Sequence, residues 1–141
     1  MIIQIIGLPG SGKTALAQAL KERINAIHLN ADEVRATVNS DLGFSPEDRI
    51  EQARRMGEMA RLISKQSVAP VIVDFVCPTE LTRKAFGKPD ILIYMETIEE
   101  SRFEDTNKMF EPPNYADLVI ERFLTDEEIS SLVSRITGMH Q

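Results

Sequence analysis

Short apolar runs alternate along the chain with stretches that have the period of an amphipathic helix. The apolar runs have the length of strands and lie at residues 2–6, 26–29, 70–74, 91–95 and 117–121. Strands that alternate with helices in this way are typical of a parallel sheet with helices on both faces. The pattern therefore predicts an α/β fold, a three-layer sandwich around a five-stranded parallel sheet.

Three helices are predicted from their apolar faces and terminal residues, at residues 14–23, 46–67 and 126–137. Ser45 followed by Pro46 is typical of a helix start, because serine caps free N–H groups and proline fits the first turn. Thr125 and Glu128 have the spacing of a capping box at the start of the last helix. The polar segment 100–114 contains two prolines, and we expect it to hold the end of a helix followed by a mobile loop.

Composition and charge narrow the class of protein. The 141 residues show no compositional break or long linker, which predicts one domain over residues 1–141. The formal net charge is −6, so the surface repels phosphate backbones and no nucleic-acid partner is expected. The one cysteine, Cys77, excludes an internal disulfide and favours a reducing, cytoplasmic compartment. The first apolar run is too short to span a bilayer, so no membrane association is expected. The assembly state stays open, and a homodimer is one possibility.

The segment after the first predicted strand carries the pattern G-x-x-x-x-G-K-[ST], in the residues Gly7, Leu8, Pro9, Gly10, Ser11, Gly12, Lys13 and Thr14. Its glycines allow the backbone to turn tightly and to point N–H groups at phosphate oxygens. Lys13 is expected to reach the β- and γ-phosphates, and the Thr14 hydroxyl to ligate Mg²⁺. A glycine-rich turn with only a structural role is the alternative. The strand before the motif and the helix after it favour instead a P-loop NTPase fold that binds ATP with Mg²⁺.

Three charged residues near the carboxyl ends of predicted strands are candidates for the acceptor side of a transfer reaction, because ligands of parallel sheets bind there. Asp32 could take a proton from an attacking hydroxyl, and Arg35 could hold an anion. Asp74 ends the third strand, where an acid often organises the magnesium ion. Structural roles stay open for all three, as a helix-start carboxylate, a solvated side chain and a turn residue respectively. Lys13, Asp32 and Asp74 form the predicted catalytic set.

Two segments carry a resemblance to a known family. Residues 29–35 read Leu-Asn-Ala-Asp-Glu-Val-Arg, and residues 39–45 read Asn-Ser-Asp-Leu-Gly-Phe-Ser. They resemble the Leu-Asp-Gly-Asp-Asn-Val-Arg and Asn-Arg-Asp-Leu-Gly-Phe-Ser stretches of the adenylylsulfate kinases. The resemblance spans residues 2–121 and is densest up to residue 78. It implies an ATP-dependent kinase that phosphorylates the 3′-hydroxyl of adenylyl sulfate and yields 3′-phosphoadenylyl sulfate, the activated form of sulfate.

The resemblance also implies roles for single residues. Asp32 would be the base near the acceptor hydroxyl. The acceptor pocket would be lined by Arg35, Phe44, Arg49 and Gln52. An arginine plane and the Phe44 ring both offer stacking surfaces for a nucleobase.

Departures from the family pattern bear on the acceptor. Cys77 stands where the family has a serine, so a covalent role of that serine does not carry over, and Glu80 replaces an arginine. The lid segment (residues 100–113) is shorter than in the family, and its only basic residues are Arg102 and Lys108, which we expect to close over the acceptor. A kinase of the same fold that acts on another alcohol, such as a nucleoside, a nucleotide or a small metabolite, is therefore an alternative. A nucleotide-binding module without transfer activity is a second one.

Overall fold

The computed structural model describes residues 1–139, and a sheet of five parallel strands lies at its centre. The strands are β1 (Ile2–Gly7), β2 (Ile27–Asn30), β3 (Val71–Asp74), β4 (Ile91–Met95) and β5 (Leu118–Ile120). Their spatial order is β2-β3-β1-β4-β5, and every neighbouring pair is parallel. The predicted α/β fold with its five parallel strands is confirmed. Residues 140 and 141 of the predicted domain lie outside the described residues.

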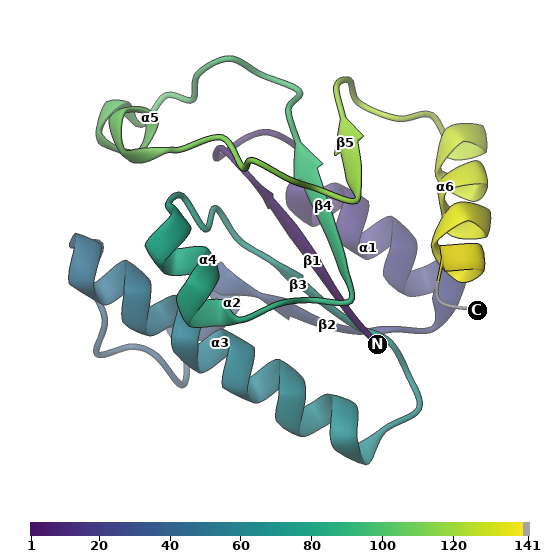
Figure 1. Cartoon of the computed structure of the whole chain (residues 1–141), viewed down its shortest axis with the longest axis horizontal. Coiled ribbons are helices and arrows are strands. Elements are labelled where there is room, and N and C mark those ends of the chain that lie inside the picture. The colour runs from purple at the N-terminus through teal and green to yellow at the C-terminus, as the bar shows by residue number, and fades with distance from the viewer. Residues whose placement is uncertain (140–141) are drawn as a thin grey trace.

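Helices cover both faces of this sheet (Figure 1). In the described part of the chain they are α1 (Lys13–Ile24), α2 (Ala31–Ala36), α3 (Pro46–Gln66), α4 (Glu80–Phe86), α5 (Glu104–Met109) and α6 (Asp126–Met139). Side chains of α1 and α6 share one apolar cluster with the sheet, and side chains of α2, α3 and α4 share the other. The predicted three layers are therefore present.

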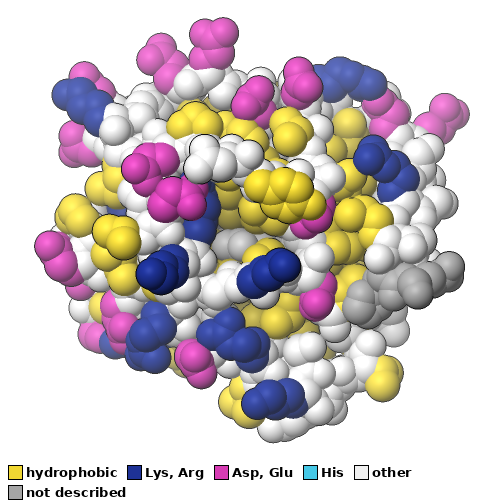
Figure 2. Space-filling view, in the orientation of Figure 1, with side chains coloured by type: hydrophobic (Ala, Val, Ile, Leu, Met, Phe, Trp, Pro, Cys, Tyr) yellow, Lys and Arg dark blue, Asp and Glu magenta, His cyan; other side chains and the backbone are white. Residues whose placement is uncertain are grey.

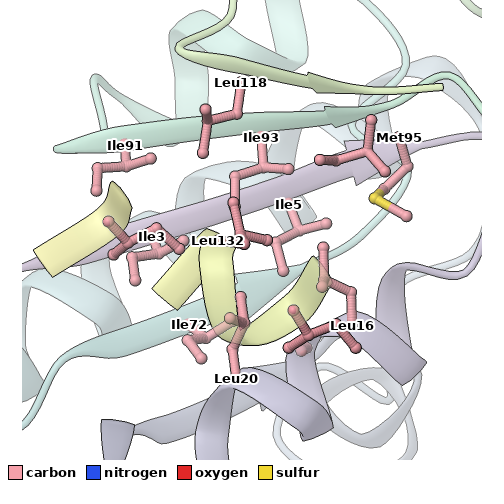
Figure 3. Packing of buried hydrophobic residues seen from close by; sticks show 14 of the residues in the cluster. Ile3, Ile5, Leu16, Leu20, Ile72, Ile91, Ile93, Met95, Leu118 and Leu132 are labelled. Carbon is pink, nitrogen blue, oxygen red and sulfur yellow. The ribbon is translucent and has the colours of Figure 1, made fainter. Parts of the chain in front are cut away.

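Branched apolar side chains fill the space between the layers. Figure 3 shows Ile3 and Ile5 of β1 packed among Leu16 and Leu20 of α1 and Leu132 of α6. All five are at most 4% exposed. Full burial of one such side chain contributes about 1.5–3 kcal/mol, so this cluster fixes α1, and with it the loop before α1, against the central strand.

The predicted caps are confirmed. The Ser45 side chain accepts a hydrogen bond from the Asp48 N–H at the start of α3, with Pro46 in the first turn. At the start of α6 the Thr125 N–H donates to Glu128 Oε1 at 3.0 Å, and the Glu128 N–H donates to Thr125 Oγ1 at 3.2 Å. These bonds satisfy N–H groups that a helix start leaves free.

Two short helices differ from the sequence prediction. The segment 100–114 does not hold a helix end and a loop; it holds the six-residue helix α5, flanked by loops on both sides. Helix α4 was not predicted at all. Seven residues give fewer than two full turns of apolar periodicity, and in α4 only Thr82 and Phe86 are buried.

Gly57 lets α3 approach the end of α4, and this contact leads to a stability prediction. A Cβ atom at position 57 would lie 2.2 Å from the Phe86 carbonyl oxygen, which is backbone and cannot turn away. We expect Gly57→Ala to lower the free energy of unfolding by about 3 kcal/mol, because α3 and α4 must separate. Urea unfolding measures this, with Gly138→Ala as the control, since position 138 has nothing within 4 Å. Equal stability of the two variants would contradict the close packing.

Candidate functional site

A cavity of about 1380 Å³ opens at the carboxyl ends of the strands. The predicted site residues that line it are Pro9, Gly10, Gly12, Lys13, Thr14, Asp32, Arg35, Phe44, Arg49, Gln52, Asp74 and Arg102. Both halves of the predicted site, the phosphate loop and the acceptor residues, therefore face one open cavity. Lys108 is not among the lining residues, and neither are Gly7, Leu8 and Ser11 of the phosphate loop.

Two glycines of the phosphate loop are required by its geometry. A Cβ atom at Gly7 would lie 2.7 Å from the Met95 carbonyl oxygen, so β1 can end beside β4 only without a side chain there. Gly12 has a φ of 94° and directly precedes α1. This left-handed conformation is easily adopted only by glycine, and it places the loop at the N-terminus of α1, where anions are attracted.

Lys13 lies in the floor of the cavity. Its Nζ donates a hydrogen bond to the Leu8 carbonyl oxygen at 2.8 Å. Burial lowers the pKa of Lys13 to about 8, while the carboxylates of Asp74 and Asp32 act in the opposite direction. Above pH 8 much of this amine is therefore neutral, and anions that bind beside it favour its charged form.

Binding of a nucleoside triphosphate is therefore expected to take up a proton in mildly alkaline solution. The phosphates favour the charged ammonium and raise the pKa of Lys13 from its value of about 8 in the free protein, so the complex binds more protons above pH 8. Affinity should accordingly fall as the pH rises through 8 and beyond. Calorimetric titration with ATP at about pH 8.5, in two buffers that differ in ionisation enthalpy, measures the proton number. No difference between the buffers would contradict the expected proton uptake.

A buried hydrogen-bond network lies beside Lys13. Asp74, 1% exposed, accepts a bond from the Thr14 hydroxyl at 2.7 Å, and His28 Nε2 lies 2.6 Å from its other oxygen. Asn30 Nδ2 lies 3.1 Å from Thr14 Oγ1 and 3.2 Å from both carboxylate oxygens. The network holds the Thr14 hydroxyl and the Asp74 carboxylate together.

These oxygen atoms fit a magnesium ion. Mg²⁺ prefers hard oxygen ligands and at nucleotide sites takes most of them from phosphates and water. Within residues 1–139, no three His, Cys, Asp or Glu side chains gather as a metal cage. Thr14 and Asp74 are therefore suited to a metal that arrives together with phosphate.

Three acceptor candidates form one group at the other side of the cavity. The Arg35 guanidinium lies 4.4 Å from the centre of the Phe44 ring and that of Arg49 lies 5.6 Å from it. Phe44 is 66% exposed, so a large part of its ring stays open to a ligand. An exposed aromatic ring with two guanidinium groups beside it can stack a planar ring and hold an anion close by.

A second hydrogen-bond network joins α3 to the loop that carries Phe44. Gln52, buried in α3, accepts a hydrogen bond from Asn39 Nδ2 at 2.7 Å. Arg55, one helical turn on, donates to both Asp41 oxygens, at 2.8 and 3.0 Å. Gln52 therefore faces the cavity and also anchors the loop that carries Phe44.

The lid segment borders the cavity, but only one of its basic residues does. Arg102 lines the cavity, whereas the exposed Lys108 pairs with Glu104 on α5 at 3.6 Å. Lys108, which we expected to face the acceptor, does not line the cavity, and its nearest acidic partner is Glu104 on the same helix. The lid is tied to the protein near both ends: the Thr97 hydroxyl donates to the Ser11 carbonyl oxygen at 2.7 Å, and the Glu111 N–H donates to that of Pro78 at 2.6 Å.

Cys77 lines the cavity but is a poor nucleophile. Burial raises the pKa of its thiol to about 12, and the side chain is 1% exposed. The thiolate is the reactive form of cysteine, so little of it exists near neutral pH. The structure favours a packing role for Cys77.

Two site residues were missed from the sequence. Asn30 could have been found, because an asparagine that follows a strand and precedes an acidic helix start is typical of an N-cap, and here it accepts from the Glu33 N–H at 3.1 Å. His28 belongs to no motif and stands inside a strand, so no local pattern indicates that it contacts Asp74.

Comparisons with known proteins identify a family and a fold that the chain shares. Residues 1–97 match the model of a family described as adenylylsulphate kinase, so the match ends just before the lid segment. An adenylyl-sulfate kinase of Paraburkholderia xenovorans is 31% identical over 168 aligned positions that cover 98% of this chain and 93% of that protein. One of Bacillus licheniformis is 38% identical over 109 positions, which cover 74% of this chain and 51% of the relative. The APS kinase CysC of Mycobacterium tuberculosis, solved in complex with AMPPNP and APS, has the same fold, with a TM-score of 0.78, 21% identity and 96% coverage of each chain.

Proposed function

This chain belongs to the adenylylsulphate kinase family of ATP-dependent kinases, and from that premise we propose that it transfers the γ-phosphoryl group of Mg-ATP to the 3′-hydroxyl of adenylyl sulfate. One observation carries the proposal. The phosphate loop and the group formed by Arg35, Phe44 and Arg49 line the same cavity. Donor and acceptor bound there would lie in one cavity, where the two reacting groups can be held close together, as phosphoryl transfer requires.

The donor half of the reaction would depend on the phosphate loop. Its backbone N–H groups and Lys13 would offset charge on the β- and γ-phosphates. Mg²⁺, held by the Thr14 hydroxyl with Asp74 behind it, would neutralise further charge as the phosphoryl group transfers.

The acceptor half would depend on Asp32 and the arginine pair. Phe44 would stack the adenine, and Arg35 or Arg49 would pair with the anionic end of adenylyl sulfate. Asp32 is exposed to the cavity and makes no hydrogen bond to another described side chain, so its carboxylate is free to accept the hydroxyl proton.

A coupled assay of ADP release with Mg-ATP and adenylyl sulfate tests the proposal, run beside a panel of other hydroxylated nucleosides and metabolites. Turnover with adenylyl sulfate that is absent from the Lys13→Ala variant would support it. Turnover only with a different alcohol would replace the acceptor and retain the donor site.

The charge of the lid favours a second candidate, a kinase for a less anionic alcohol. Residues 100–113 hold four acids and two bases, a net charge of −2. Glu100, Glu104 and Asp105 line the cavity, opposed within the lid by Arg102 alone. Figure 2 shows acidic side chains along the edge of the molecule where α5 lies in Figure 1. Such a lid repels a sulfate-bearing acceptor and tolerates a neutral one, so the neutral sugars and nucleosides of the panel address this candidate directly.

A further inference from the structure

We propose that His28 is a positioning residue for the donor-site magnesium ion: it holds the Asp74 carboxylate in the orientation that keeps the Thr14 hydroxyl ready to ligate the metal. The inference rests on the donor half of the proposed function and is independent of the acceptor. It adds a residue that the sequence motifs do not contain.

The first step is the bond between His28 and Asp74. Both side chains are buried, at 8% and 1% exposure, and His28 Nε2 lies 2.6 Å from Asp74 Oδ1. An ionised carboxylate can only accept hydrogen bonds, so the proton of this bond lies on Nε2. A buried polar ring on a strand is costly unless it is paired, and Asp74 is the partner that pairs it.

The second step is the hydroxyl of Thr14. It donates its one hydrogen to Asp74 Oδ2 at 2.7 Å and accepts from Asn30 Nδ2 at 3.1 Å. A hydroxyl has one hydrogen and two lone pairs, so one lone pair stays available to a metal. Asn30 cannot turn its amide, because Asn30 Oδ1 is occupied by the Glu33 N–H at the start of α2. The direction of the free lone pair is therefore fixed by Asp74 and Asn30 together.

The third step is what His28 adds. The torsion that turns an aspartate carboxylate is soft, so bonds on one oxygen leave the group free to swing. Asn30 Nδ2 is shared between the two oxygens at 3.2 Å and does not favour either, whereas His28 bonds Oδ1 alone and leaves Oδ2 to Thr14. The charge of Asp74 acts on nearby Lys13, but the Lys13 amine donates its hydrogen bond to the Leu8 carbonyl oxygen and not to Asp74. His28 is thus the contact that holds Oδ1 in place while Thr14 bonds Oδ2.

The test measures metal dependence of binding, with ATP and Mg²⁺ as the probes. Calorimetry gives the Kd of ATP in excess Mg²⁺ and in EDTA. The quantity of interest is the Kd in EDTA divided by the Kd in Mg²⁺, which states how much the metal strengthens binding. Loss of groups that orient metal ligands typically lowers metal affinity about 10- to 100-fold, so His28→Leu should reduce the ratio about tenfold or more and leave the Kd in EDTA unchanged. His28→Gln, which keeps an N–H at a similar distance along the side chain, should restore most of the ratio.

The control is Ile27→Ala, which removes packing from the neighbouring residue of β2 without touching Asp74 and should keep the wild-type ratio. An unchanged ratio in His28→Leu would overturn the proposal, whether ATP binding is unaffected or is weakened equally in Mg²⁺ and in EDTA. If His28→Leu does not fold, His28→Asn takes its place, because the asparagine side chain is too short for its N–H to reach Asp74. Equal ratios for the Asn and Gln variants would then overturn the proposal. A wild-type protein that binds no ATP would overturn this inference together with the donor half of the proposed function. Failure of the acceptor assignment alone would appear as missing turnover with adenylyl sulfate. The binding experiment contains no acceptor, so its result does not depend on that assignment.

Discussion

The Asp32→Asn variant is expected to lose about 10³-fold in kcat and to bind ATP as the wild-type protein does. Asp32 lies at the start of α2 on the wall of the cavity, where its charge acts on Lys13 but its side chain is not part of the phosphate loop. Asparagine keeps the shape and the helix position of the residue but cannot take the proton of an attacking hydroxyl. Turnover should therefore fall while the donor site stays intact.

The control for this variant is Glu33→Gln, which removes the next acid of the same helix turn. Glu33 does not line the cavity, and its N–H, not its carboxylate, makes the bond to Asn30. Steady-state kinetics with the acceptor, together with a calorimetric Kd for ATP, separate the two effects. A kcat within about threefold of the wild-type value would exclude Asp32 as the base, since a general base contributes at least about 10²-fold.

Lys13→Ala is expected to have the second large effect, about 10³-fold or more in kcat/KM for ATP. The variant removes a buried positive charge at the point where the β- and γ-phosphates would lie, and the remaining loop N–H groups cannot replace it. Because burial holds the pKa of Lys13 at about 8, its replacement should also abolish the proton uptake on ATP binding.

Kinetics over a range of ATP concentrations measure this loss, with Lys21→Ala as the matched control. Lys21 lies exposed in the last turn of α1, the helix that Lys13 begins. Retention of ATP turnover in Lys13→Ala would show that the phosphate loop does not hold the donor in the expected way.

Much of the fold followed from local sequence patterns, because the inner strands β1, β3 and β4 are almost wholly buried and consist mostly of apolar residues. Strand β4 was predicted at its observed bounds, Ile91–Met95, and the starts of α3 and α6 were predicted from their capping residues. Helix α4 was not predicted because it is short, although Thr79 and Gly87 at its ends are residues that commonly cap helices. Helix α5 has no side-chain cap and few apolar residues, so nothing local distinguishes it from a loop.

The candidate site was predictable where a motif requires fixed spacing and not where residues meet through the fold. The phosphate loop is continuous in sequence, and Arg35 and Phe44 lie near each other along the chain. The contact between His28 and Asp74 joins positions 46 residues apart and depends on the pairing of β2 with β3. The position of Lys108 outside the cavity depends on how α5 is placed in the fold, and the family resemblance gave no indication of it.

Two hydrogen bonds anchor the ends of the lid, and a third reaches its middle, where Thr106 Oγ1 accepts from Arg49 Nη2 at 3.2 Å. Thr97 fastens the chain to the phosphate loop and Glu111 fastens it to the segment before α4, and neither bond involves the residues between them. A longer or more basic segment grafted between these two points would leave the sheet and the phosphate loop as they are. In this architecture the lid and the group of Arg35, Phe44 and Arg49 would together set the acceptor, while exchange of the lid would leave the residues that handle ATP in place.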